Sequence, residues 1–342
     1  MSTGTGSEPV LEAREDAAPV RGPAGPLRRR GEEFLYRYTV VVVLFVMIAV
    51  FSLLRPSTFF TLGNLTTIAN SQAVLLILAL ALTLPLAVGE FDLSVASGLG
   101  FGAILTGYLS GSAHWPLAAT VVVVLLVGAL VGLVNGLFVV HVGVNAFIIT
   151  LGTGTVLTGL TLLVSGGQIL GGIPAGLGTA MTTTVGGLAV PVYLALGLTV
   201  LLWYVYEYTP LGRHLTFIGL GAEVARLAGV AVKPLRWGAF VAASVIASGC
   251  GILAVGLLGS ADPSASGSYL LPAYAGAFLG TTTIRPGRFN AWGTVVALAL
   301  LVVGVTGLQL LGAASWVEQV FNGGALVLAV TFARLVSRTD HS

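Results

Sequence analysis

The sequence predicts an all-α integral membrane protein with about ten transmembrane helices and both termini in the cytoplasm. Hydrophobic residues make up 56% of the 342-residue chain and charged residues only 8%, with a mean hydropathy of +0.99. A water-soluble globule of this composition would lack the polar surface needed to cover itself. The apolar residues also form separate runs of spanning length, and the cationic residues fall between these runs with a strong bias to one side.

The cationic residues set the orientation. With the N-terminus inside and ten spans, every one of the 15 Lys and Arg residues except Arg55 falls on the cytoplasmic side, as the positive-inside rule requires. They precede the first span, fill two loops and end the chain: Arg14, Arg21, Arg28, Arg29, Arg30 and Arg37; Arg213, Arg226, Lys233 and Arg236; Arg285 and Arg288; Arg334 and Arg338. The net charge of +2 therefore reflects membrane topology, and no nucleic-acid partner is expected.

The first span follows a polar tail. Residues 1–33 are rich in Gly, Pro, Ala and charge and have no apolar period, which predicts a disordered cytoplasmic tail. The run from Tyr38 to Leu54 lacks a small-residue cleavage site and ends at Arg55-Pro56, as an anchor does and a secretory signal does not. The transmembrane domain is expected over 34–336, with a second short cytoplasmic tail at 337–342.

Nine further apolar runs follow, at 71–88, 93–111, 117–140, 144–165, 187–206, 235–258, 268–283, 292–311 and 316–336. The segments 89–92, 141–143, 207–234 and 284–291 then face the cytoplasm. The segments 55–70, 166–186, 259–267 and 312–315 face outward.

Small and polar residues mark the run at 117–140. Gly128, Gly132 and Gly136 recur every fourth residue, so they share one helix face and allow close approach of a neighbouring helix. Helix packing is the simplest interpretation, although such a face also permits sliding between two states. Asn135 needs a partner at membrane depth. Either an interhelical hydrogen bond or a position lining a solute pathway would supply one.

The chain has no energy-coupling or catalytic motif. Lys233 is the only lysine and lies outside any phosphate-binding loop, so the chain cannot hydrolyse ATP alone. The spans are nearly free of ionisable groups, with Glu90 and Asp92 at a membrane edge, and this argues against ion coupling. The four histidines share no metal-ligand spacing, and motifs of hydrolases are absent. We expect neither an enzyme nor a bound metal or cofactor.

The segment from Gly89 to Val95 reads G-E-F-D-L-S-V and lies between the second and third spans. Asp92 is suited to cap the third helix by accepting hydrogen bonds from free amides near Ser94. The segment also resembles the G-x-D-L-S-V-x-S signature of the permease subunits of ribose-type sugar importers of the ABC class. Gly89, Asp92 and Ser94 carry this motif.

The resemblance continues in order along about residues 35–336. The matching segments are Gly132–Val139, Phe147–Thr153, Ser165–Gln168, Gly212-Arg213 with Gly219, Glu223–Gly229, Trp292–Thr294, Leu310–Gly312 and Trp316–Gly323.

The resemblance implies a cytoplasmic coupling loop at 207–236 that docks on a separate ATPase subunit. Independently, Glu223 to Gly229 is able to form a short amphipathic helix closed by a glycine, at the E-A-A-x-x-x-G spacing of ABC permeases. We expect Arg213, Glu223, Arg226 and Gly229 at or beside this contact. An ordinary solvated loop with a helical turn is the alternative.

The resemblance further implies two halves of inverted topology, spans two to five and seven to ten, a second permease copy or homologue, and an extracytoplasmic binding protein. The expected cargo is a small neutral sugar, a ribose-like pentose or a hexose, carried across the cell membrane. The sequence departs from the family at Ser268–Ala273, where a G-Y-E-L-D-A segment loses both carboxylates, and at Arg285–Arg288. A nucleoside or branched-chain amino acid permease, and an ion-coupled carrier, therefore stay as alternatives.

Overall fold

The computed structural model describes residues 26–339, and the side-chain surroundings of residues 37–331. The chain divides into two units, Met1–Tyr36 and Arg37–Ser342, and the account below concerns the second. Most of the predicted tail at 1–33 and the end of the predicted tail at 337–342 lie outside the described residues. Helix α1 begins at Pro26, inside the predicted tail, because Leu27 and the charged residues after it are good helix formers that lead into the first span.

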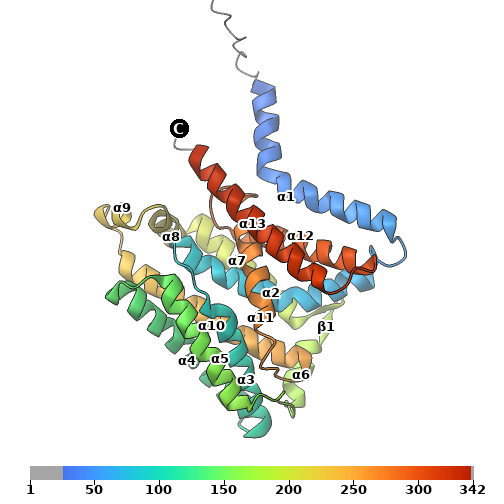
Figure 1. The fold of residues 1–342 in the computed structure, drawn as a ribbon, viewed down its shortest axis with the longest axis vertical. Coiled ribbons are helices and arrows are strands. Elements are labelled where there is room, and N and C mark those ends of the chain that lie inside the picture. Colours follow the sequence, from blue (N-terminus) through green and yellow to red (C-terminus); the bar gives the residue numbers. More distant parts are fainter. Residues whose placement is uncertain (1–25, 340–342) are drawn as a thin grey trace, which may run out of the picture. The chain divides into compact units, whose positions relative to one another are not determined.

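The described chain is almost entirely helical (Figure 1). The long helices are α1 (Pro26–Leu54), α2 (Leu62–Ala87), α3 (Ser94–Thr106), α4 (Leu117–Gly136), α5 (Ala146–Ser165), α7 (Val190–Tyr208), α10 (Val232–Leu258), α11 (Gly267–Gly280), α12 (Ala291–Leu310) and α13 (Trp316–Thr339). Two π-helical segments, η1 (Gly107–Ser112) and η2 (Leu137–Val142), extend α3 and α4. The short elements are α6 (Ala175–Thr182), α8 (Pro210–Leu220), α9 (Ala222–Leu227) and an antiparallel hairpin of β1 (Thr184–Val185) and β2 (Leu188–Ala189).

Seven helices within the described residues are long and apolar enough to cross a membrane. They are the Arg37–Leu54 part of α1, α2, α4 with η2, α5, α7, α10 and α12. This confirms an all-α membrane protein. Of the other predicted spans, α3 has 13 residues before it continues as η1, and α11 has only 14 residues.

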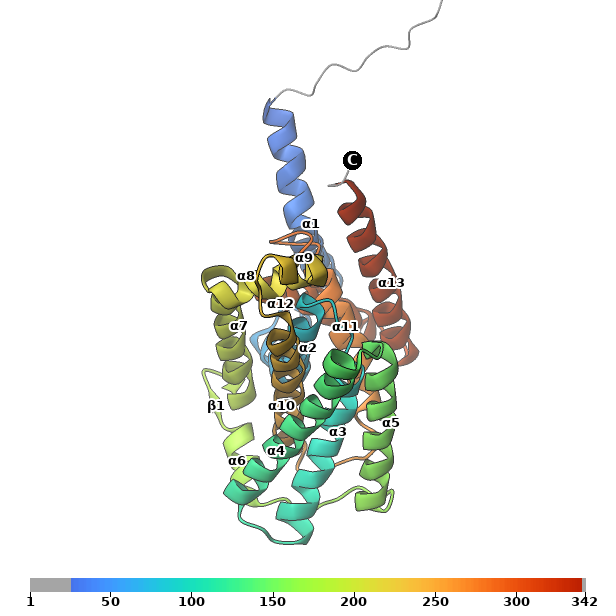
Figure 2. The same ribbon diagram turned by 90° about the vertical axis from the view of Figure 1, so that its left-hand side faces the viewer.

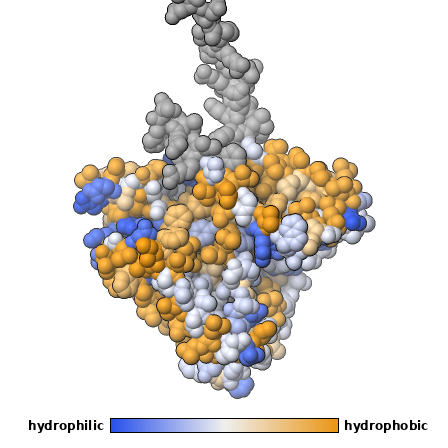
Figure 3. Space-filling model, viewed as in Figure 1, coloured by the Kyte–Doolittle hydropathy of each residue, from blue (hydrophilic) through white to orange (hydrophobic). Residues whose placement is uncertain are grey.

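The core forms where α2 and α10 meet their neighbours. Nearly every residue of α2 from Ala73 to Ala87 is buried, and α10 packs against α2, α3 and α4 (Figures 1 and 2). Much of the outer surface remains apolar, as a lipid-facing surface should (Figure 3).

The glycine face of α4 packs directly against α10. A Cβ at Gly128 would meet Ser248, one at Gly132 would lie 2.5 Å from the Cα of Val241, and one at Gly136 would press on the ring of Trp237. Side chains at these positions would force the two backbones apart. These three glycines thus let α4 pack closely against α10.

Most helix ends fall within three residues of the predicted spans, but α2 begins nine residues before the predicted position 71. Its first turns carry Asn and Thr residues, which resemble a loop. In the structure, Thr61 caps the helix by accepting a hydrogen bond from the amide of Asn64. Asn70 binds the β-hairpin, accepting from the amide of Ala189 at 2.8 Å. The uncharged segment 166–186 also contains α6 and β1 rather than loop alone.

Contacts bring the segments rich in arginine to one end of the helices, here called the basic end. Arg37 binds the 281–290 loop, Arg285 of that loop pairs with Glu207 at the end of α7, and Arg236 at the start of α10 pairs with Glu90. Helices α8 and α9 lie at this end, and α6 lies at the opposite end (Figure 2).

Candidate functional site

The loop between α2 and α3, residues 88–93, lies at the basic end, where Glu90 pairs with Arg236. Gly89 adopts φ +82°, a left-handed conformation that favours glycine. It lies against Gly219 near the end of α8, where a Cβ would collide with the carbonyl oxygen of Ala87. The two glycines let the backbone of α8 touch the backbone of this loop directly.

A second contact joins the loop to α10. Glu90 forms a largely buried ion pair with Arg236, the fifth residue of α10. Burial raises the pKa of Glu90, although Arg236 acts in the opposite direction. The loop is therefore held by both elements that flank α9.

Asp92 is fully buried at the start of α3. Its Oδ1 accepts hydrogen bonds from the amide of Ser94 at 3.0 Å and from the hydroxyl of Ser94 at 2.5 Å. The expected hydrogen bond to the Ser94 amide is present, but the N-cap position belongs to Leu93, so Asp92 acts from one residue earlier. Burial raises the pKa of Asp92 to about 6, and its hydrogen bonds with Ser94 oppose the shift.

Hydrogen bonds connect the Ser94 hydroxyl to α4 and, through Asn135, to α5. Asn135 donates from Nδ2 to Ser94 Oγ at 2.9 Å and accepts at Oδ1 from the hydroxyl of Thr153 at 2.8 Å. Thr150 Oγ1 accepts from the amide of Leu93 at 3.0 Å. We call Asp92, Ser94, Asn135, Thr150 and Thr153 the polar cluster. Asn135 thus makes hydrogen bonds to two neighbouring helices, and the cluster ties α3, α4 and α5 together.

The segment 210–229, which contains α8 and α9, has the opposite character, and we call it the docking segment for the role proposed below. Glu223 and Arg226 form an ion pair at 2.5 Å while 68% and 65% of their side chains remain exposed, and Arg226 lowers the pKa of Glu223. On the same helix Ala225 is fully buried, and Val224 and Leu227 are exposed. Hydrophilic residues gather at the position of α9 in Figure 3. The short amphipathic helix predicted here is present.

Two further predicted residues flank this helix. Arg213 is exposed on α8. Gly229 adopts φ +84° after the end of α9 and has open space around it, which fits the predicted glycine closure. Exposed apolar side chains beside exposed charged ones are typical of surfaces that bind a partner protein.

Comparison with known proteins gives the family. A model described as the permease component of branched-chain amino acid transport systems matches residues 64–330. The chain belongs to this permease family. Similar proteins include the D-allose transport system permease protein of Escherichia coli (strain K12), 28% identical over 89% of this chain and 94% of that protein.

Two further similar proteins are named as import permeases. The ribose import permease protein of Haemophilus influenzae (strain ATCC 51907 / DSM 11121 / KW20 / Rd) is 28% identical over 87% of this chain and 93% of its own length. The autoinducer 2 import system permease protein of Yersinia pseudotuberculosis serotype O:3 (strain YPIII) is 33% identical over 78% of this chain and 81% of its own. No solved structure matches significantly. The permease is a multi-pass membrane protein, and the comparisons identify the ribose-type group of sugar permeases.

The permease brings some predicted residues together and keeps others apart. Asp92, Ser94 and Asn135 share one cluster, and Gly89 joins them to α8. The sequence did not single out Thr150, Thr153 or the Glu90–Arg236 pair. The two threonines lie inside the matched stretch 147–153, whereas nothing in the sequence signalled that residues 146 positions apart would pair. Within the part of the chain that the structure describes, no group of three or more His, Cys, Asp or Glu residues lies close enough to hold a metal ion.

Proposed function

We propose that the chain is the membrane-spanning subunit of an ABC importer for a small neutral sugar, driven by separate ATPase subunits and supplied by an extracytoplasmic binding protein. The observation that carries this proposal is the match to D-allose and ribose permeases over about nine-tenths of each chain. The polar cluster supports it, since its groups other than the Asp92 carboxylate are hydroxyls and an amide, which suit an uncharged cargo.

The proposal includes ten crossings. The continuous helix of α3 and η1 runs for 19 residues, Ser94–Ser112, about 28 Å at 1.5 Å per residue and close to the thickness of a bilayer core. In this proposed topology, successive long helices alternate in direction. By the positive-inside rule the basic end faces the cytoplasm, and spans two to five and seven to ten form two inverted halves, as in other transporters built from repeats.

The docking segment is the proposed contact for the ATPase, through Arg213, Glu223, Arg226 and Gly229. Movement of this segment has a short route to the transmembrane helices. The end of α8 touches the 88–93 loop at Gly89, and α10 holds the same loop through the Arg236–Glu90 pair. From the loop, the polar cluster reaches α3, α4 and α5.

Two permease chains would enclose the solute pathway between them, each with an ATPase on its docking segment. ATP binding would draw the two docking segments together, and the contacts described above would pass this motion to the helices. Because a binding protein selects the solute, the permease itself needs few polar groups along its pathway.

Co-expression with the cognate ATPase tests this assignment. We expect the ATPase to co-purify with the permease, and radiolabelled ribose or allose to enter cells only when both subunits and the binding protein are present. Uptake that continues without the ATPase and collapses with a proton uncoupler would instead support an ion-coupled carrier.

The family description favours a second candidate, a permease for branched-chain amino acids. A competition assay separates the two. Excess unlabelled leucine leaves labelled sugar uptake unchanged if the cargo is a sugar. If leucine is itself imported through the assembled system and sugars are not, the sugar assignment is wrong.

A further inference from the structure

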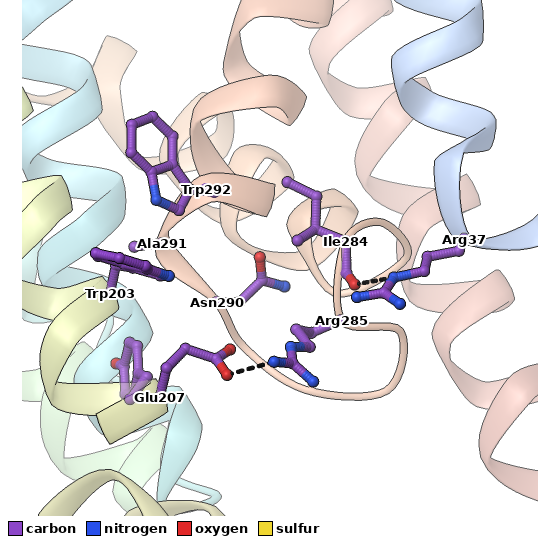
Figure 4. A pocket seen from close by; sticks show the side chains of 9 residues that line it. Arg37, Trp203, Glu207, Ile284, Arg285, Asn290, Ala291 and Trp292 are labelled. Carbon is purple, nitrogen blue, oxygen red and sulfur yellow. Dashed lines mark hydrogen bonds and ion pairs between the residues drawn. The ribbon is translucent and has the colours of Figure 1, made fainter. Parts of the chain in front are cut away.

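A cavity of about 140 Å³ opens at the basic end, and none of its lining residues belongs to the polar cluster or the docking segment. It lies between the end of α7, the start of α12, the 281–290 loop and Arg37 of α1 (Figure 4). Its lining includes Arg37 and Arg285, the acid Glu207, and two indoles, Trp203 and Trp292. Such a mixture of cationic and aromatic side chains is unusual in a chain with so few charges.

The cavity has more donors than acceptors. Arg285 donates to Glu207 at 2.7 Å, and Arg37 donates from Nε to the carbonyl oxygen of Ile284 at 2.7 Å. A guanidinium has five N–H groups, so these single bonds orient each arginine and leave further donors. Two arginines against one carboxylate give the cavity an excess of positive charge.

Other polar groups of the wall are already used. Asn290 accepts from the amide of Gly293 at 2.6 Å and donates to the backbone carbonyls of Gly280, Thr283 and Arg288. The Tyr206 hydroxyl pairs with Thr83 at 2.8 Å. Neither indole N–H has a hydrogen-bond partner among the described residues. The arginines and indoles are therefore the groups of this cavity able to bind a ligand, and all of them are donors.

The backbone at the cavity is held in an uncommon conformation. Ile284 has φ +61°, which is costly for a β-branched residue. The turn is maintained by Arg37, whose carbonyl oxygen accepts from the amide of Ile284 at 3.1 Å and from the hydroxyl of Thr283 at 3.0 Å. This turn directs the Ile284 carbonyl to the Arg37 guanidinium and fixes α1 to the 281–290 loop.

The surroundings place the cavity beside lipid. Tyr204, Tyr208 and Leu201 of α7 are more than half exposed, and Trp292 is exposed as well. Exposed tyrosine and tryptophan at the end of a spanning helix are typical of the membrane–water interface. Basic pockets between helices on the cytoplasmic side bind phosphorylated lipid head groups.

We propose that this cavity binds the phosphate of an anionic phospholipid, with Arg37 and Arg285 as its ligands and the two indoles beside the head group. The bound lipid would join α1 to the 281–290 loop and α7, and its acyl chains would lie along the exposed residues of α7. Glu207 would compete with the phosphate for Arg285.

Native mass spectrometry of the delipidated permease tests this proposal with two lipids, phosphatidylglycerol and phosphatidylcholine. We expect Arg37→Gln and Arg285→Gln each to weaken phosphatidylglycerol binding about fivefold, the effect of one basic residue near a lipid surface. Arg288→Gln is the matched control, since this exposed arginine of the same loop does not line the cavity. This variant should bind phosphatidylglycerol with unchanged affinity. Glu207→Gln should bind the lipid more tightly, a gain that misfolding cannot produce.

Soluble phosphate distinguishes the source of the ligand. We expect millimolar inorganic phosphate or glycerol 1-phosphate not to displace phosphatidylglycerol. Displacement by either compound would assign the cavity to a soluble phosphate and overturn the lipid proposal. Equal binding of phosphatidylcholine, an equal loss in Arg288→Gln, or weaker binding in Glu207→Gln would also overturn it.

Discussion

The side chains of the polar cluster are largely buried and hydrogen-bond to one another or to the backbone of the 88–93 loop, whereas the docking segment keeps about two-thirds of its Glu223 and Arg226 side chains in solvent. Both regions touch the same loop, residues 88–93. A buried hydrogen-bonded network loses free energy when one member is removed, because its partners stay behind without water. An exposed ion pair contributes little to folding. The difference indicates that the cluster maintains the structure and that the docking segment is available for binding.

The largest effect is expected from reversing a charge on the docking segment. Glu223→Arg should leave the permease folded, because the side chain is exposed, and reduce sugar uptake at least about tenfold, as loss of a principal interface residue does. Uptake and size-exclusion profiles of the assembled importer measure the two quantities. The double variant Glu223→Arg with Arg226→Glu restores the ion pair in reverse. If it also restores uptake, the pair acts only within α9 and the docking role fails.

The next effect concerns the charge of Asp92. Its pKa is about 6 in the folded protein against 3.8 normally, so the folded state retains the proton over a range where the unfolded state has lost it. Stability is therefore highest below about pH 4 and falls as pH rises to about 6, by up to about 3 kcal/mol. Asp92→Asn, which keeps the acceptor for Ser94, should lose this dependence. Thermal unfolding in detergent from pH 4 to 7.5 measures it, and parallel curves for the two proteins would contradict the prediction.

The packing that holds the cluster in place gives a smaller effect. In Gly132→Ala the new Cβ would lie 2.5 Å from the Cα of Val241, and overpacking against backbone costs about 1–3 kcal/mol. Gly152→Ala on α5 is the control, because a Cβ there meets nothing within 4 Å. We expect a lower unfolding temperature for Gly132→Ala and an unchanged unfolding temperature for Gly152→Ala. Equal stability of both would show that α4 and α10 separate easily.

The smallest effect is the loss of one interhelical hydrogen bond. Thr153→Val removes the donor to Asn135, and hydrogen bonds between membrane helices contribute about 0.6 kcal/mol on average. Thr155→Val, two residues along the same helix, removes only a bond to the carbonyl of Leu151 in its own helix. Thermal unfolding should rank Thr153→Val below Thr155→Val, and the reverse order would argue against a stabilising cluster.

The apolar runs predicted nearly all long helices, because lipid selects continuous hydrophobic segments of a set length. The start of α2 was predicted too late because its polar first turns bind the β-hairpin, a tertiary contact that no local pattern contains. The resemblance to permease motifs identified Asp92, Ser94 and Asn135 as candidate residues. The sequence did not show that one serine hydroxyl would join the other two, nor that Arg37 and Arg285 would line one cavity. Such pairings depend on how helices distant in sequence pack, which hydropathy does not determine.

The most direct test of the account is reconstitution in liposomes. The purified permease alone, and the permease with its ATPase and binding protein, are compared for accumulation of labelled sugar with and without ATP. We predict uphill accumulation only in the complete assembly supplied with ATP. Uphill accumulation by the permease alone would contradict the account.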